Sequence, residues 1–180
     1  MELEIFVREL ADAAPKESDL RKCGLSSDQA SDFIRSYFCI KRDRPLPVGG
    51  GTDQVLELLR KWDLSKVEIG MVRFPDPPVE QAGKIYIGYV EADPLVMLLD
   101  SGEIVVHEYG TKEHLLWPVA KNGSKLLEAL LIAARFLEKT GIGTIDFNDS
   151  KVAQPFALAC ASAAGGDRYL DFYRMLLGAE

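Results

Sequence analysis

No segment of the 180 residues is long and apolar enough to cross a membrane, which takes about 18 consecutive apolar residues. The first residues carry acids at positions 2, 4 and 9, a pattern that argues against a signal or transit peptide. Cysteine is scarce as well: the three thiols are scattered, lack metal-ligand spacing and indicate a reducing compartment. We therefore expect a cytoplasmic protein without a membrane partner.

The motifs of common enzyme classes are also missing or incomplete. Three glycines at 49–51 precede a predicted helix, but no lysine precedes Thr52 as a P-loop requires, and no third glycine completes a dinucleotide-binding pattern. Residues 146–151 begin like a calcium loop but place Lys151 where that loop needs glycine. No nucleophile elbow occurs. We interpret the glycines as a flexible hinge and predict no cofactor, no metal and no catalytic residue.

Positive charge is the third scarcity. The formal net charge is −7, which disfavours nucleic-acid binding because that function needs a cationic surface. Most of the excess negative charge lies between Pro75 and Leu115, where the sequence has eight acidic residues and two lysines, a net charge of −6. This segment is either a solvated face that keeps the protein in solution or an acidic patch that steers a basic partner.

Hydrophobic periodicity predicts helices at both ends of the chain and strands between them. Helices are expected over residues 3–10, from Ser26 or Ser27, from Thr52 or Asp53 through Trp62, over 122–140, over 150–164 and after Asp167. Strands are expected over residues 66–74, 83–93, 95–100 and 103–110, with Ile85, Ile87 and Tyr89 on one face of the second. Short turns between consecutive strands imply an α+β fold, with a mainly antiparallel meandering sheet flanked by N- and C-terminal helices.

One long segment, residues 85–138, resembles the core of the SUKH superfamily, which groups bacterial toxin-immunity proteins with relatives of a fungal cell-wall synthesis regulator. The resemblance rests first on a strand that ends in Ile-Gly at 87–88 and on the acidic turn at 91–93 that follows it. An apolar strand then closes in Asp-x-Gly before a further strand, over 98–105. Last comes a helix with a serine near its start, Ser124, and a Phe-Leu pair near its end, 136–137. The opening helix, 24–38, is similar too. The family's Leu-Pro entry is faint at 46–47, and residues after Gly141 do not align.

The resemblance implies one SUKH-like domain over 1–180, with 141–180 as a helical C-terminal extension. It also implies a non-enzymatic role, because a typical bacterial member binds a cognate toxin, often a nuclease or a nucleic-acid deaminase, and blocks its active site. An acidic sheet face would complement the basic cleft of such a toxin. The candidate partner-binding residues are then Glu91, Asp93, Asp100, Glu103, Glu108, Tyr109, Glu113 and Trp117.

Other interpretations stay open. Tyr109 and Trp117 would serve equally well as packing residues where the sheet meets the long helix. A regulatory scaffold, like the fungal relatives, would use the same surface for an endogenous partner. A small-ligand protein or an enzyme would require His107 and His114 to converge with nearby acids.

Overall fold

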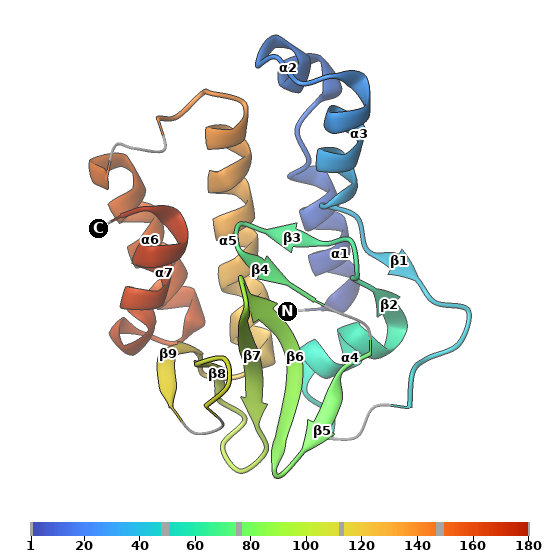
Figure 1. Ribbon diagram of the computed structural model, residues 1–180, viewed down its shortest axis with the longest axis vertical. Coiled ribbons are helices and arrows are strands. Elements are labelled where there is room, and N and C mark those ends of the chain that lie inside the picture. Colours follow the sequence, from blue (N-terminus) through green and yellow to red (C-terminus); the bar gives the residue numbers. More distant parts are fainter. Residues whose placement is uncertain (1, 48–50, 75–76, 112–113, 147–149, 180) are drawn as a thin grey trace.

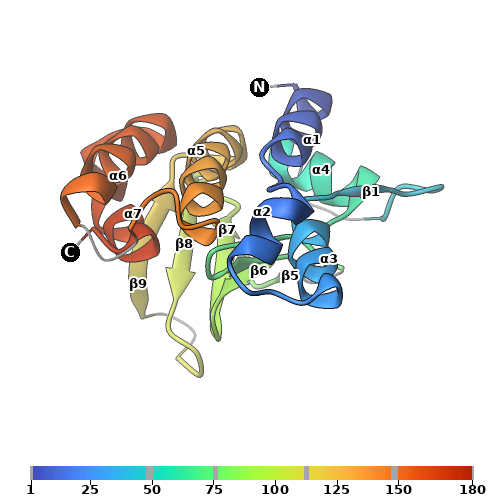
Figure 2. The same cartoon turned by 90° about the horizontal axis from the view of Figure 1, so that it is seen from above.

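The computed structural model describes residues 2–47, 51–74, 77–111, 114–146 and 150–179, and in it the helices gather on one face of an antiparallel sheet (Figures 1 and 2). The helices are α1 (Leu3–Asp12), α2 (Glu17–Lys22), α3 (Ser27–Arg35), α4 (Gln54–Lys61), α5 (Gly123–Gly141), α6 (Ser150–Ala164), the 3₁₀ turn η1 (Asp167–Tyr169) and α7 (Leu170–Leu177). The strands are β1 (Ile40–Lys41), β2 (Trp62–Asp63), β3 (Glu68–Ile69), β4 (Val72–Arg73), β5 (Val79–Gln81), β6 (Lys84–Val90), β7 (Asp93–Leu98), β8 (Ile104–His107) and β9 (Leu115–Ala120).

The sheet follows the order of the chain. Its strands run β3-β4-β6-β7-β8-β9, with β5 also paired to β6, and every pairing is antiparallel. Strands β1 and β2 form a separate two-stranded pair. The predicted α+β fold, with a mainly antiparallel sheet between N- and C-terminal helices, is confirmed. Within the described ranges, no helix is both long and apolar enough to span a bilayer.

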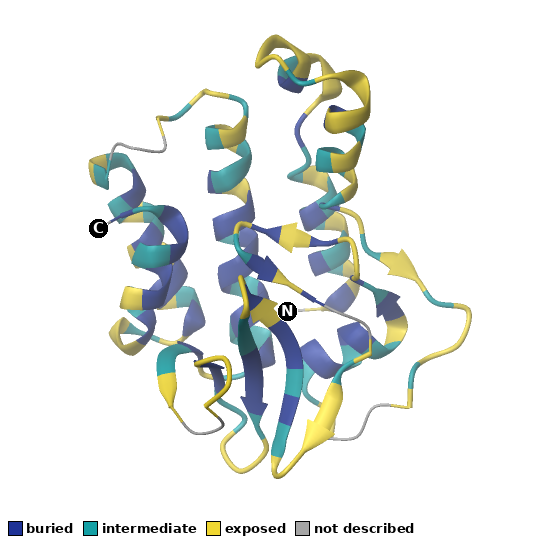
Figure 3. Ribbon diagram, viewed as in Figure 1, coloured by how far each residue is buried: buried dark blue, intermediate teal, exposed yellow. Residues whose placement is uncertain are grey.

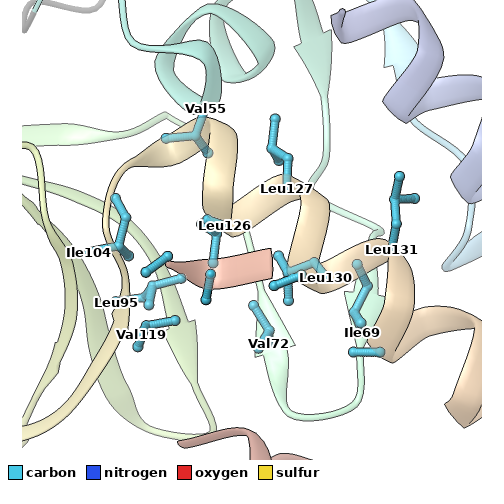
Figure 4. Close-up of a cluster of buried hydrophobic side chains, with 14 of the residues drawn as sticks. Val55, Ile69, Val72, Leu95, Ile104, Val119, Leu126, Leu127, Leu130 and Leu131 are labelled. Carbon is cyan, nitrogen blue, oxygen red and sulfur yellow. The ribbon is translucent and has the colours of Figure 1, made fainter. Parts of the chain in front are cut away.

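Helix α5 lies at the centre of the hydrophobic core. Figure 4 shows its leucines directed at the sheet and at α4, among side chains from six other elements or their edges: Val55, Ile69, Val72, Leu95, Ile104 and Val119. On another side, α6 packs against α5 through small buried residues: Ala153, Ala157, Cys160, Ala161 and Ala164. Small side chains let the two backbones approach closely. Figure 3 shows burial concentrated in α5, α7 and the central strands, and more exposure in α2, α3 and β5.

One carboxylate joins the N-termini of two helices. Oδ1 of Asp53 accepts a hydrogen bond from the amide of Val55 at 2.9 Å, which makes Asp53, and not Thr52, the N-cap of α4. Its Oδ2 accepts a hydrogen bond from the amide of Gly123, the first residue of α5, at 3.1 Å. Gly123 has no room for a side chain, because a β-carbon there would collide with this same carboxylate. The cap therefore fixes the start of α5 against α4.

Three local predictions are wrong, each because of a backbone feature. Helix α4 ends at Lys61, since Trp62 takes an extended conformation and pairs with Lys41 in the β1–β2 ribbon. Residues 66–74 do not form one strand, because Gly70 adopts a φ of 60° and turns the chain into the β3–β4 hairpin. The other predicted segments with a described backbone match helices or strands to within a few residues.

The third correction concerns the face on which Tyr89 lies. A register shift between Tyr86 and Gly88 interrupts β6, so Val90 enters the core and Tyr89 is exposed. Gly88 permits this irregularity, because a β-carbon at that position would collide with the carbonyl oxygen of Arg73. Tyr89 therefore lies opposite the face shared by Ile85 and Ile87.

We predict that the Asp53–Gly123 junction is worth about 2 kcal/mol of folding free energy, since Asp53→Ala removes a helix cap and leaves the Gly123 amide without its acceptor. Gly123→Ala should destabilise through the collision with the carboxylate. In the Asp53→Ala background the same change should cost at least about 1 kcal/mol less. Urea unfolding of the four proteins measures this coupling. Strictly additive effects would contradict the junction.

Candidate partner-binding surface

The face of the sheet turned away from the helices carries an apolar row across five strands. Cross-strand pairing aligns the row, whose members are Val79, Tyr86, Val96, Val105 and Pro118. The neighbours of Tyr86, Val96 and Val105 along their strands belong to the core beneath α5, so alternation directs these three residues to the opposite face. In Figure 2, every helix that covers the sheet centre lies on the other side. Val96 and Val105, in the middle of the row, are nonetheless 0% and 1% exposed. Another molecule can therefore contact this face at the exposed Val79 and at the half-buried Tyr86 and Pro118.

At one end of this face, two connections lie together. The β6–β7 turn is made of Glu91 and Ala92, with Glu91 at a φ of 54°. The first residue of β7, Asp93, accepts a hydrogen bond through Oδ1 from the amide of Tyr109 at 2.8 Å. The described start of the β8–β9 loop, residues 108–111, extends away from the helices in Figure 2. Asp93 thus anchors the start of that loop to the neighbouring turn.

The loop has its own internal bonds, centred on Glu108. Its Oε2 accepts a hydrogen bond from the hydroxyl of Thr111 at 3.0 Å and lies 3.1 Å from Nδ1 of His114. The Glu108 amide donates to the carbonyl of His114 at 3.0 Å. Tyr109, in the same loop, is 73% exposed. Glu113 lies outside the described residues.

Asp100 and Glu103 lie at the opposite end of the same strands. Strand β7 has six residues, so its two ends are about 17 Å apart. Asp100 is exposed in the β7–β8 turn. The predicted acidic residues therefore divide into two groups and do not form one patch.

Glu103 has a structural role within the molecule. Its carboxylate faces the guanidinium of Arg168 through two contacts, of 2.8 and 3.2 Å, and accepts a hydrogen bond from the hydroxyl of Tyr169 at 3.2 Å. The side chain is only 18% exposed. Burial, followed by the nearby Glu103 charge, raises the pKa of Tyr169. Glu103 thus joins η1 to the sheet, and this partnership makes it a poor anchor for another protein.

Trp117 also lies apart from Tyr109. In β9 it pairs with Val106 of β8, and its partly buried side chain packs against the hydrophobic core. With Gln154 and Arg174 it lines a cavity of about 500 Å³ where β9 meets the C-terminal helices. Trp117 is therefore a packing residue, but beside α6 and α7 and not only at the long helix α5 as the sequence suggested.

The two histidines differ in environment. His107 ends β8 and is 8% exposed, whereas the side chain of His114 is 64% exposed and contacts Glu108. No group of three or more histidine, cysteine or acidic side chains with a geometry suited to a metal occurs among the described residues. Burial raises the pKa of both Cys39 and Cys160 to about 12, which keeps these thiols protonated and unreactive at neutral pH.

No protein-family model, no curated protein and no solved structure matches this chain. The functional interpretation therefore depends on the geometry of the surface itself.

The sequence pattern did not single out Tyr86 of β6 or Pro94 of β7 as members of this surface. Tyr86 and Pro94 lie on the same face as Val96, beside the β8–β9 loop. The alternation of β6 would have revealed Tyr86, but a continuous alternation assigns Tyr89 to the wrong face. We define the end surface as Tyr86, Glu91, Asp93, Glu108 and Tyr109, and keep this name below.

We predict that Asp93 holds the β8–β9 loop in place. Asp93→Ala removes the acceptor of the Tyr109 amide, so hydrogen exchange at that amide should accelerate about tenfold, as expected for the loss of roughly 1.4 kcal/mol. Asp100→Ala changes an acid at the other end of the hairpin and should leave the Tyr109 amide unaffected. Residue-resolved exchange by NMR makes the comparison. Unchanged exchange in Asp93→Ala would show that the carboxylate does not anchor the loop.

Proposed function

We propose that this protein is a non-enzymatic binding module that takes a basic protein partner at the end surface. Its role would be that of an immunity protein, which binds a cognate toxin of the nuclease or deaminase type and neutralises it. The observation that carries the proposal is the exposed Tyr109 side chain on a loop bonded to Asp93 and flanked by acids.

The chemistry of the end surface supports a protein partner. Tyrosine is enriched among the residues that dominate interface energetics, because its ring buries a large area at low entropic cost. Asp93 and Glu108 already constrain the loop, so less conformational freedom is lost on binding than for an unanchored loop.

The charge of the end surface supports a basic partner. Glu91, Asp93 and Glu108 provide three carboxylates, while Arg73 reaches this end and donates a hydrogen bond to the carbonyl of Glu91 at 3.1 Å. Clustered acids of this kind raise the association rate with a cationic protein and make binding sensitive to salt. Proteins that act on nucleic acids carry the complementary basic clefts.

The test is affinity purification of the tagged protein from its native cells at low and high salt, with mass spectrometry of the eluate. We expect one small basic protein, recovered stoichiometrically at low salt and less at high salt. Tyr109→Ala should lower its affinity about thirtyfold, as for a binding hot spot of about 2 kcal/mol. Glu108→Lys should abolish recovery at low salt.

Asp100→Lys is the matched control, because it makes the same charge reversal at the far end of the hairpin. It should retain the partner. Equal recovery with Tyr109→Ala, Glu108→Lys and Asp100→Lys would overturn the proposed surface. Weak recovery of several partners, instead of one, would favour the regulatory scaffold.

A further inference from the structure

The end surface contains a small cavity. It has a volume of about 200 Å³ and is lined by Tyr86, Pro94, His107, Glu108, Tyr109 and Thr111, together with Gly110. Sites for drug-sized ligands and cofactors are larger, about 300–1,000 Å³. This cavity therefore has the size to accept one side chain of another protein.

Three adjacent strands and one loop build the cavity. Tyr86 and Pro94 come from β6 and β7 on the face opposite the helices, and His107 comes from the end of β8. The loop residues from Glu108 to Thr111 complete the lining, and two anchors fix their position: the Asp93 bond to the Tyr109 amide and the Thr111 bond to Glu108. The cavity is thus formed before any partner arrives.

The lining suits a cation. Tyr86 and Tyr109 supply aromatic rings, whose faces attract ammonium and guanidinium groups. The carboxylate of Glu108 uses Oε2 for both Thr111 and His114, and no described residue occupies its Oε1, which is the acceptor for a ligand. Neither lysine nor arginine is among the described residues that line the cavity. An anionic side chain would meet the charge of Glu108 without compensation.

We propose that this cavity is the anchor pocket for one arginine side chain of the partner. The inference rests on the proposed function, because it names the group through which a basic protein would bind the end surface. A planar guanidinium both stacks on aromatic rings and presents N–H donors to a carboxylate, which a compact ammonium does less well. In the complex, the arginine would lie between the tyrosines with its donors directed at Glu108.

The direct test uses a small probe, so that it needs no identified partner. ¹⁵N-labelled protein is titrated with three probes: Nα-acetyl-arginine amide, its lysine analogue, and Nα-acetyl-citrulline amide, which has nearly the same shape as the arginine compound but no charge. We expect saturable shifts at the Gly110 and Thr111 amides with the arginine compound only, and about tenfold weaker binding for Glu108→Gln. Equal shifts with citrulline, stronger binding of the lysine analogue, or shifts confined to other regions would overturn the proposal.

Variants of Tyr86 separate failure of the pocket from failure of the proposed function. Tyr86→Leu removes the ring and should weaken the arginine probe and the purified partner alike, whereas Tyr86→Phe keeps the ring and should retain both. Thermal unfolding checks that each variant folds. If Tyr86→Leu does not fold, Glu108→Gln tests the pocket in its place. A partner that needs Tyr109 but binds Tyr86→Leu and Glu108→Gln normally would refute the pocket and leave the surface intact. Probe binding without any basic partner in cells would refute the function and support the pocket.

Discussion

Burial of α5 between the sheet and the other helices is the interaction on which the remaining structure depends. Its apolar residues contact β3, β4, β7, β8 and β9 on one side and small residues of α6 on another, and the Asp53 carboxylate sets where the helix begins. All of this packing uses one face of the sheet. The helices that cover the centre of the sheet therefore lie on that face, and none of them covers the opposite face. The surface available to a partner is thus a consequence of how the core is built.

The order of the strands then determines which residues that surface contains. Antiparallel pairing of β6, β7 and β8 places the turn at Glu91 and the loop at Tyr109 at one end of these strands. Asp100 and Glu103 lie at the opposite end of the same strands. The two ends have different uses. Asp93 and Glu108 stabilise a protruding loop, while Glu103 is engaged by Arg168 and Tyr169 and holds the C-terminal helices to the sheet. An acidic composition alone does not distinguish these roles.

Local sequence signals predicted the elements that depend on local interactions. Ser26 and Asp53, each one of two predicted caps, and the apolar stripe of α5 are all readable from residues two to four apart. The missed features are non-local or depend on one unusual backbone angle. Gly70 splits an apparent strand, and the irregularity at Gly88 reverses the face of Tyr89. The acids appeared contiguous in sequence, but the hairpin separates them.

The most direct test of the account is site-specific photo-crosslinking in the native cells. A photoreactive phenylalanine derivative in place of Tyr109 keeps an aromatic ring on the end surface. The same derivative in place of Leu158 is also exposed but lies on α6 in the helical layer. The account predicts a crosslink to one small basic protein from position 109 and none from position 158. A partner captured from position 158 and not from position 109 would contradict it, because binding would then use the helices and not the open end of the sheet.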